Sequence, residues 1–258
     1  MAVGAVTNII PEERIDLDKV AILLDIDGTI LDFAPTPREV WVPPSLRRTL
    51  HGLFARTGGA LALVSGRSLN DLDLLLAPLQ LPAIGGHGAE LRPFPGGASG
   101  PNRTPSLNAD LKRKLATIAE LGPGILIEDK GYSLALHYRL APEKGEAVWA
   151  AVADICATAP PGTVEILPGK AVVEVKQKGF SKATAVVELM AIPPFAGRRP
   201  VFIGDDTTDE PVFPVLPGLH GIGFSVGHRA KNAAGCFARP ADVREWLDSI
   251  LASHAASA

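Results

Sequence analysis

The stretch VAILLDIDGTILDF, residues 20–33, begins with an apolar run and then sets two carboxylates two positions apart before a glycine. An apolar run without polar alternation is typical of a strand in a parallel sheet that helices cover on both faces. Side chains two apart on a strand point the same way, so we expect Asp25 and Asp27 to converge where the strand ends. Open α/β sheets bind ligands at this edge. Taken alone, the stretch is equally consistent with a strand that ends in an ordinary Asp-Gly turn.

A second apolar run, in VFIGDDTTDE at residues 201–210, also ends in acids: Asp205, Asp206 and Asp209. Acids are common in the first turn of a helix, where they stabilise it. However, two neighbouring strands that bring acids to one edge would accumulate negative charge, which a cation relieves. Carboxylate oxygens are ligands that suit Mg²⁺. Together the two stretches favour a metal site over coincidence.

Short apolar runs alternate with helical patterns before residue 91 and again after residue 179. Between them, LRPFPGGASGPNRTPS (91–106) has the glycine, proline and serine content of a linker. A helix–hairpin–helix–hairpin pattern follows, which indicates an α+β module with an antiparallel sheet. We therefore predict an α/β protein: a Rossmann-like core with a parallel sheet, formed by residues 1–103 and 179–258, and an inserted α+β cap domain at residues 104–178.

Composition narrows the class of protein. The net charge of −3 and the lack of a basic run argue against nucleic-acid binding. Two cysteines, without a Cys-x-x-Cys motif, indicate neither a disulfide framework nor a zinc site. No apolar run approaches the roughly 18 residues of a membrane span, and the N-terminus does not resemble a signal peptide. We expect a cytoplasmic monomer that acts on a small molecule.

Two further motifs carry candidate phosphate ligands. In LVSGRS (63–68), Ser65 and the Gly66 amide could bind a phosphoryl group at a helix start, although a serine helix cap explains them equally well. In GFSKATAV (179–186), Lys182 falls in a first helical turn, where a cation opposes the helix dipole. Beside an acidic cluster, however, this lysine can bind both a carboxylate and a phosphate.

The motifs DxDGT, SGR, a lysine at a helix start and GDDxTDE together resemble those of the haloacid dehalogenase (HAD) phosphatases. Within that superfamily, GHGAE (86–90), HYR (137–139), GKAVVEVKQKGFSKATAV (169–186) and GDDTTDE resemble the trehalose-6-phosphate phosphatase family. The resemblance implies a HAD core with the cap between the second and third motifs, and Mg²⁺-dependent hydrolysis of trehalose 6-phosphate. One departure is Ala183, where many relatives have glycine.

The resemblance also implies roles for the motif residues. Asp25 would be the nucleophile that becomes an aspartyl-phosphate, and Asp27 would be the general acid and then the general base. Ser65 and Lys182 would bind the phosphate oxygens. The metal ligands would be Asp25, the Asp27 carbonyl and Asp205, with Asp206 and Asp209 as further or outer-shell partners.

Strand alternation in GYSLALHYR (131–139) and KAVVEVK (170–176) puts polar residues on one face of the cap sheet. A solvated face explains this pattern by itself, but near a phosphatase site the same groups could bind sugar hydroxyls. His87 and Glu90, in GHGAE, either join such a site or form an ordinary turn. The residues assigned to substrate binding are Arg67, His87, Glu90, Glu128, Lys130, His137, Arg139, Lys170, Glu174 and Lys176.

Other functions remain open. Another HAD sugar-phosphate phosphatase or a phosphohexomutase would share the core motifs. A non-catalytic sugar-phosphate sensor would have lost a catalytic residue, whereas Asp25, Asp27, Lys182 and Asp205 are all present.

Overall fold

The computed structural model describes residues 15–34, 39–97, 106–169 and 171–255. The chain divides into two compact units. Residues 1–100 and 181–258 form the first, called the core unit below, and residues 101–180 form the second, called the inserted unit.

The core unit is built on a seven-stranded sheet with the order β11-β10-β9-β1-β2-β3-β4. Neighbouring strands are parallel, except that β3 and β4 are antiparallel. Leu24, the last residue of β1, is level with Leu63 of β2 and Ile203 of β9. The chain segments that follow these three strands therefore begin at the same edge of the sheet. The strands are β1 (Val20–Leu24), β2 (Leu61–Val64), β3 (Ala83–Gly85), β4 (Glu90–Arg92), β9 (Arg199–Gly204), β10 (Ile222–Val226) and β11 (Gly235–Phe237).

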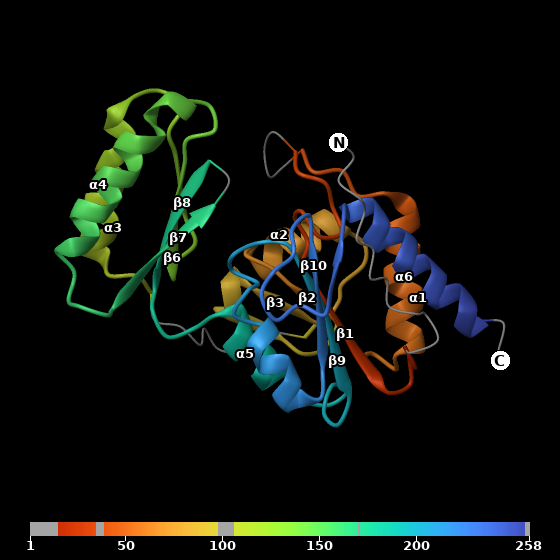
Figure 1. The fold of residues 1–258 in the computed structure, drawn as a ribbon. Coiled ribbons are helices and arrows are strands. Elements are labelled where there is room, and N and C mark those ends of the chain that lie inside the picture. The colour runs from red at the N-terminus through yellow and green to blue at the C-terminus, as the bar shows by residue number, and fades with distance from the viewer. Residues whose placement is uncertain (1–14, 35–38, 98–105, 170, 256–258) are drawn as a thin grey trace. The chain divides into compact units, whose positions relative to one another are not determined.

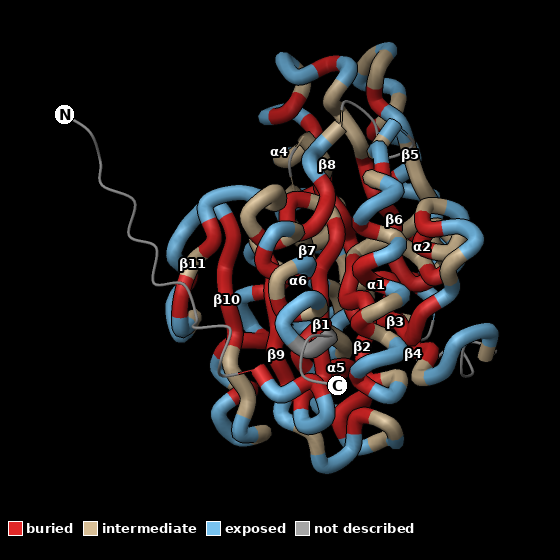
Figure 2. The backbone as a smooth tube through the Cα atoms, turned by 90° about the vertical axis from the view of Figure 1, so that its right-hand side faces the viewer, coloured by how far each residue is buried: buried red, intermediate tan, exposed pale blue. Residues whose placement is uncertain are grey.

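Helices cover both faces of this sheet (Figure 1). On β1, Val20, Ile22 and Leu24 face one hydrophobic cluster, whereas Ala21 and Leu23 face another. The first cluster contains residues from α1 (Pro44–Arg56), α2 (Leu69–Leu76) and α6 (Pro240–Ala255). The second contains residues from α5 (Lys182–Leu189) and the 3-10 helix η5 (Phe213–Leu219). β1 and β2 are buried along their length and β10 is buried except at its first residue, as Figure 2 shows in red, so their uninterrupted apolar sequences match a sheet covered on both sides.

The inserted unit, largely yellow-green to green in Figure 1, has its own antiparallel sheet with the order β5-β6-β8-β7. Leu134, Leu136, Val173 and Val175 on its two central strands pack with residues of both helices in a separate hydrophobic cluster. The elements are α3 (Ala109–Ala116), η3 (Thr117–Leu121), β5 (Leu126–Asp129), β6 (Ser133–His137), η4 (Pro142–Lys144), α4 (Gly145–Ala157), β7 (Val164–Gly169) and β8 (Val172–Gln177).

The predicted fold class, a Rossmann-like α/β core with a parallel sheet and an inserted α+β domain with an antiparallel sheet, is confirmed by these two sheets. Among the described residues, no helix combines the length and the apolar character that a bilayer crossing requires.

Two short edge strands were not predicted. β4 lies at the start of the segment predicted to be a linker, and β11 follows a loop near the C-terminus. On β4, the buried Arg92 guanidinium donates to both carboxylate oxygens of Asp73 on α2, at 2.6 Å each, and to the Leu81 carbonyl. This ion pair ties the edge strand to the neighbouring helix.

Candidate active site

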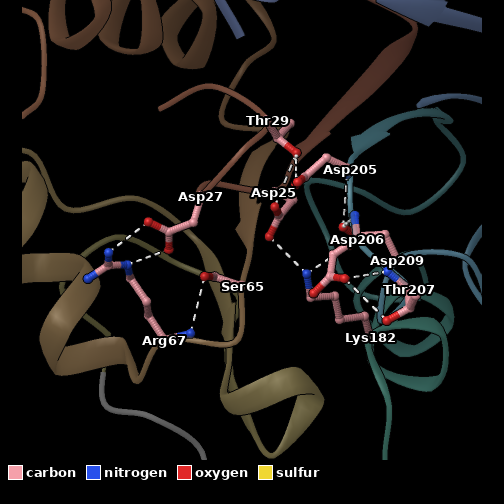
Figure 3. Close-up of polar contacts among 10 residues, drawn as sticks. All are labelled: Asp25, Asp27, Thr29, Ser65, Arg67, Lys182, Asp205, Asp206, Thr207 and Asp209. Carbon is pink, nitrogen blue, oxygen red and sulfur yellow. Dashed lines mark hydrogen bonds and ion pairs between the residues drawn. The ribbon is translucent and has the colours of Figure 1, made fainter. Parts of the chain in front are cut away.

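Asp25 lies at the first residue after β1, at the carboxyl edge of the core sheet (Figure 3). Its side chain is buried, and both carboxylate oxygens accept hydrogen bonds. Lys182 Nζ donates to Oδ1 at 2.8 Å, and Thr29 Oγ1 donates to Oδ2 at 3.1 Å. The carboxylate is thus held at a fixed orientation by one cation and one hydroxyl.

Lys182 is the first residue of α5, and its ammonium group joins two strand ends. Besides Asp25, it donates to Asp209 Oδ1 at 2.7 Å. Ser181 and Thr184 form a capping box that fixes the start of this helix. Burial by itself would lower the pKa of Lys182, but the charges of Asp209 and Asp25 outweigh it and raise the pKa. Lys182 therefore remains a cation inside the protein.

Three carboxylates converge beside this lysine. Oxygens of Asp25, Asp205 and Asp209 all lie within 4.8 Å of one another. Burial, followed by the charge of Asp25, raises the pKa of Asp205 to about 8. Burial and the charge of Asp25 likewise raise the pKa of Asp209, to about 7, against the opposing effect of Lys182. Three acids facing one ammonium leave excess negative charge, and this oxygen-donor set fits a hard divalent cation.

Gly28 allows these groups to lie so close together. It has a φ of +89°, and a Cβ at this position would lie 2.1 Å from Asp205 Oδ2. The hydroxyl of Thr29, the next residue, also lies 2.8 Å from Asp205 Oδ1, so its one hydrogen is shared between two of the acids. Thr29 is not among the site residues predicted from the sequence, although its place in the DxDGT motif could have identified it.

The side chains of Asp209 and Asp206 have local partners. Asp209 Oδ2 accepts from the backbone N–H groups of Asp205 and Asp206, at 3.1 Å each, so this carboxylate holds the loop after β9. Asp206 is exposed, and its Oδ1 accepts from the Thr207 N–H at 2.6 Å. Asp206 is not among the three acids whose oxygens converge.

The side chain of Asp27 binds a different partner from the one that binds Asp25. Its two carboxylate oxygens accept from Arg67 Nε and Nη2 at 2.6 and 2.7 Å, which is a bidentate ion pair. Burial would lower the pKa of Arg67, but the hydrogen bond to Asp27 and its charge raise it. Ser65 Oγ accepts from the Arg67 N–H at 3.2 Å, so residues of the SGR motif lie beside Asp27 (Figure 3).

The GHGAE loop supports two of these motifs. Glu90 Oε2 accepts from the Leu69 N–H at the start of α2, at 2.6 Å. The His87 ring lies against Gly66, where an added Cβ would be 2.4 Å from it. Gly88, with a φ of +106°, packs so closely on the Ser181 carbonyl that a Cβ there would be 2.3 Å from its oxygen. The loop therefore contacts both the SGR motif and the start of α5.

In the inserted unit, polar side chains pair across one face of the sheet. Buried Glu174 accepts from Ser133 Oγ at 2.6 Å and from Lys130 Nζ at 3.0 Å. His137 Nε2 lies 2.9 Å from Glu128 Oε2, and this contact lowers the pKa of Glu128. These five residues come from β5, β6, β8 and the turn between β5 and β6.

The remaining predicted residues of this unit differ in their surroundings. Arg139 follows β6 and is partly exposed. Lys176 is buried, and its ammonium contacts Glu165 on β7 and the Phe180 carbonyl. Lys170 lies outside the described residues.

Comparison with known proteins gives consistent results. The family model described as Trehalose-phosphatase matches residues 23–238. The trehalose-6-phosphate phosphatase of Escherichia coli (strain K12) is 38% identical over 90% of this chain and 86% of its own length. A probable trehalose-phosphate phosphatase of Sinorhizobium fredii is 43% identical over 82% of this chain and 79% of its own. Among solved structures, the C-terminal domain of C. albicans trehalose-6-phosphate phosphatase matches with a TM-score of 0.80 and 23% identity, covering 91% of this chain and 92% of that one.

Proposed function

This chain belongs to the trehalose-phosphatase family, and from that premise we propose that it hydrolyses trehalose 6-phosphate to trehalose and phosphate. The observation that carries the proposal is the position of Lys182, whose ammonium holds Asp25 and Asp209 together beside Asp205. A buried carboxylate that is kept oriented by a cation at a sheet edge can attack a phosphoryl group.

Asp25 is the nucleophile of this proposal. One of its carboxylate oxygens forms a bond to phosphorus as the bond from phosphorus to the sugar oxygen breaks, giving an aspartyl-phosphate. Asp27 in its protonated form gives its proton to the departing sugar oxygen. The resulting Asp27 carboxylate then takes a proton from water, whose oxygen attacks phosphorus and releases phosphate and Asp25.

Neighbouring residues orient these two acids. Lys182 offsets the charge that builds up on the phosphoryl oxygens, and Ser65, whose hydroxyl still has a hydrogen to donate, binds one of them. Arg67 donates two hydrogen bonds to the Asp27 carboxylate, so its proposed role is to orient this group; the oxygen that carries the proton in the acid form gives up one of these two bonds.

We propose Mg²⁺ as the cofactor, held by Asp25, Asp205 and the Asp27 carbonyl. When bound, it would neutralise charge on the carboxylates and the phosphate. Asp209 acts from outside this ligand set, because its two oxygens are bonded to Lys182 and to two backbone N–H groups. Asp206 is also an outer residue, since its carboxylate accepts from Thr207.

The polar face of the inserted unit is proposed to bind the sugar. Carboxylates accept hydrogen bonds from hydroxyls, and lysine, histidine and arginine donate to them, so a polyol could replace the pairs seen there. The residues proposed for this role are Glu128, Lys130, His137, Arg139, Lys170 and Glu174. His87 and Glu90 are proposed instead to support the core motifs, since Glu90 binds the start of α2.

We also propose that the protein acts as a cytoplasmic monomer. Cys156 and Cys236 are both free thiols, which is typical of a reducing compartment. Size-exclusion chromatography with light scattering, compared with the chain mass of 27.0 kDa, tests the oligomeric state.

The function is tested by measuring phosphate release from a panel of mono- and disaccharide phosphates, with Asp25→Asn as the control. We expect trehalose 6-phosphate to be the preferred substrate, the variant to retain less than a hundredth of the activity, and chelation to stop turnover until Mg²⁺ is restored. Preference for a monosaccharide phosphate would indicate another sugar-phosphate phosphatase. Transfer of label between sugar positions with little free phosphate would indicate a phosphohexomutase, and binding without turnover would indicate a sensor.

A further inference from the structure

The DxDGT motif continues into a tight loop, residues 26–31, whose backbone groups bond to one another. The Ile26 carbonyl accepts from the Ile30 and Leu31 N–H groups, at 3.1 and 2.9 Å. The Leu31 carbonyl in turn accepts from the Gly28 N–H at 2.7 Å. Because these bonds cross the loop, residues 26–31 form one compact turn that is displaced as a whole.

This loop carries two groups of the candidate active site. It contains Asp27, the proposed general acid. It also contains Thr29, whose hydroxyl lies 3.1 Å from Asp25 Oδ2 and 2.8 Å from Asp205 Oδ1 (Figure 3). A rotation of the loop would therefore move the Asp27 carboxylate and the Thr29 hydroxyl together. The proposed chemistry requires both groups to be aligned with the reacting atoms.

Apolar packing holds the buried side of the loop. The residues Ile26, Ile30 and Leu31 are fully buried, in the same hydrophobic cluster as Val243 and Leu247 of α6. Packing of this kind opposes exposure to water but has no preferred direction. It fixes the depth of the loop better than its orientation, which a directional contact has to set.

Arg244 on α6 makes such a contact. Its guanidinium Nη1 donates to the Ile30 carbonyl at 3.0 Å and to Asp32 Oδ2 at 3.2 Å, so each acceptor takes one of the two hydrogens of this nitrogen. The Arg244 side chain is 21% exposed and that of Asp32 is 70% exposed. Because an exposed ion pair contributes little, the bond to the carbonyl of buried Ile30 is the stronger constraint.

We propose that Arg244 is a positioning residue, which orients the loop at residues 26–31 and thereby aligns Asp27 and Thr29. The planar guanidinium presents its donors in a fixed geometry, so it constrains the direction in which the Ile30 carbonyl points. The arginine and the loop both belong to the core unit. The kinetic part of this inference rests on the proposed function, but the orientation of the loop does not.

Hydrogen–deuterium exchange of the intact, metal-free protein tests the loop directly. Arg244→Met keeps an unbranched side chain but removes the guanidinium. Arg239→Met is the matched control, because Arg239 is exposed and pairs with Asp242. We expect the peptide that contains residues 26–31 to exchange at least about threefold faster in Arg244→Met, since a hydrogen bond from a charged donor is lost. Exchange of β9, and of the loop in Arg239→Met, should match the parent protein.

Two results of this experiment would overturn the proposal. Unchanged exchange of the loop in Arg244→Met would mean that the arginine does not constrain it. Equally faster exchange of the loop and of β9 would mean that Arg244 only stabilises the core unit as a whole.

Turnover separates positioning from stabilisation. With excess Mg²⁺, kcat of Arg244→Met should fall at least about fivefold for both trehalose 6-phosphate and p-nitrophenyl phosphate, because misplaced groups slow the chemical step for either ester. KM for trehalose 6-phosphate should stay within about twofold, since the residues proposed to bind the sugar belong to the inserted unit. An unchanged kcat, or a fall for the sugar ester alone, would contradict the positioning role.

A second variant, Arg244→Lys, covers the case in which Arg244→Met does not fold. Lysine keeps the positive charge but lacks the fixed geometry of the guanidinium, so we expect smaller effects on loop exchange and on kcat in the same directions. Values equal to those of the parent protein would overturn the proposal. If the parent protein did not hydrolyse trehalose 6-phosphate, the proposed function would fail, while loop exchange and the turnover of p-nitrophenyl phosphate would still decide the role of Arg244.

Discussion

Removing divalent cations should make the stability of the core unit depend on pH through Asp205. Burial and the charge of Asp25 raise the pKa of Asp205 to about 8, from an ordinary value of 3.8. Between these two values the folded protein carries a proton that the unfolded chain has released. The free energy of unfolding therefore falls as the pH rises, and the stability present at low pH is lost as the pH approaches 8.

The size of the effect follows from the number of protons involved. Asp209 also has a raised pKa, but Lys182 and two backbone N–H groups donate to its carboxylate, so we assign about one proton to Asp205 and Asp209 together. One proton is worth about 1.4 kcal/mol per pH unit, or about 2.7 kcal/mol between pH 5 and 7. Because Asp205 is only partly buried, solvent screening reduces this to about 2 kcal/mol. For a chain of this size, that corresponds to about 4–8 °C in Tm.

Urea unfolding in excess EDTA at pH 5, 6 and 7 measures this change. Trp246 is buried beside Phe237 in the core unit and supplies the fluorescence signal, and a Trp149→Phe background removes the signal of the inserted unit. Asp205→Asn in the same background is the control, because it keeps every histidine but cannot release the proton. We expect the free energy of unfolding to change less steeply with pH in the variant, by an amount that corresponds to about one proton. Excess Mg²⁺ should reduce the pH dependence of the parent protein. Equal slopes in the two proteins without metal would refute the assignment.

Three further changes test other parts of the structure. Gly28→Ala would place a Cβ 2.1 Å from Asp205 Oδ2, so Mg²⁺ affinity measured by calorimetry should fall at least about tenfold, and unchanged affinity would contradict the packing described. Arg92→Met removes a buried guanidinium from a bidentate ion pair and should cost about 3 kcal/mol in urea unfolding. A loss below about 1 kcal/mol would show that the edge strand does not depend on this pair. Glu174→Ala should raise KM at least about tenfold for trehalose 6-phosphate but not for p-nitrophenyl phosphate, and equal effects on both would argue against sugar binding.

The convergence of Asp25 and Asp205 could be predicted because it depends on topology. Parallel strands end at a common edge, and each acid directly follows an apolar run, so their meeting requires only that β1 and β9 be neighbours. The position of Lys182 in a first helical turn, where its charge is unfavourable, likewise indicated that this side chain has a partner elsewhere in the fold. A cation that opposes the helix dipole needs another partner, and the structure provides Asp25 and Asp209.

Other features depend on contacts that no local pattern encodes. β4 and β11 each have three residues, too few for an alternation to be recognised. The pairing of Arg67 with Asp27 joins residues 40 positions apart in different loops. The alternation of side chains along β8 correctly predicted that Lys176 lies on the same face of the sheet as Glu174. The burial of Lys176, however, depends on Glu165, a residue of the adjacent strand.

The separate hydrophobic cluster of the inserted unit has an evolutionary consequence. Its helices and sheet pack on one another from a continuous stretch of chain, while the acids and Lys182 belong to the other unit. Mutations that repack one interior thus leave the other undisturbed. Because the inserted unit is the proposed sugar-binding module, a lineage could exchange or remodel it to accept a new sugar without rebuilding the proposed catalytic residues, and a laboratory could graft it between homologues for the same purpose.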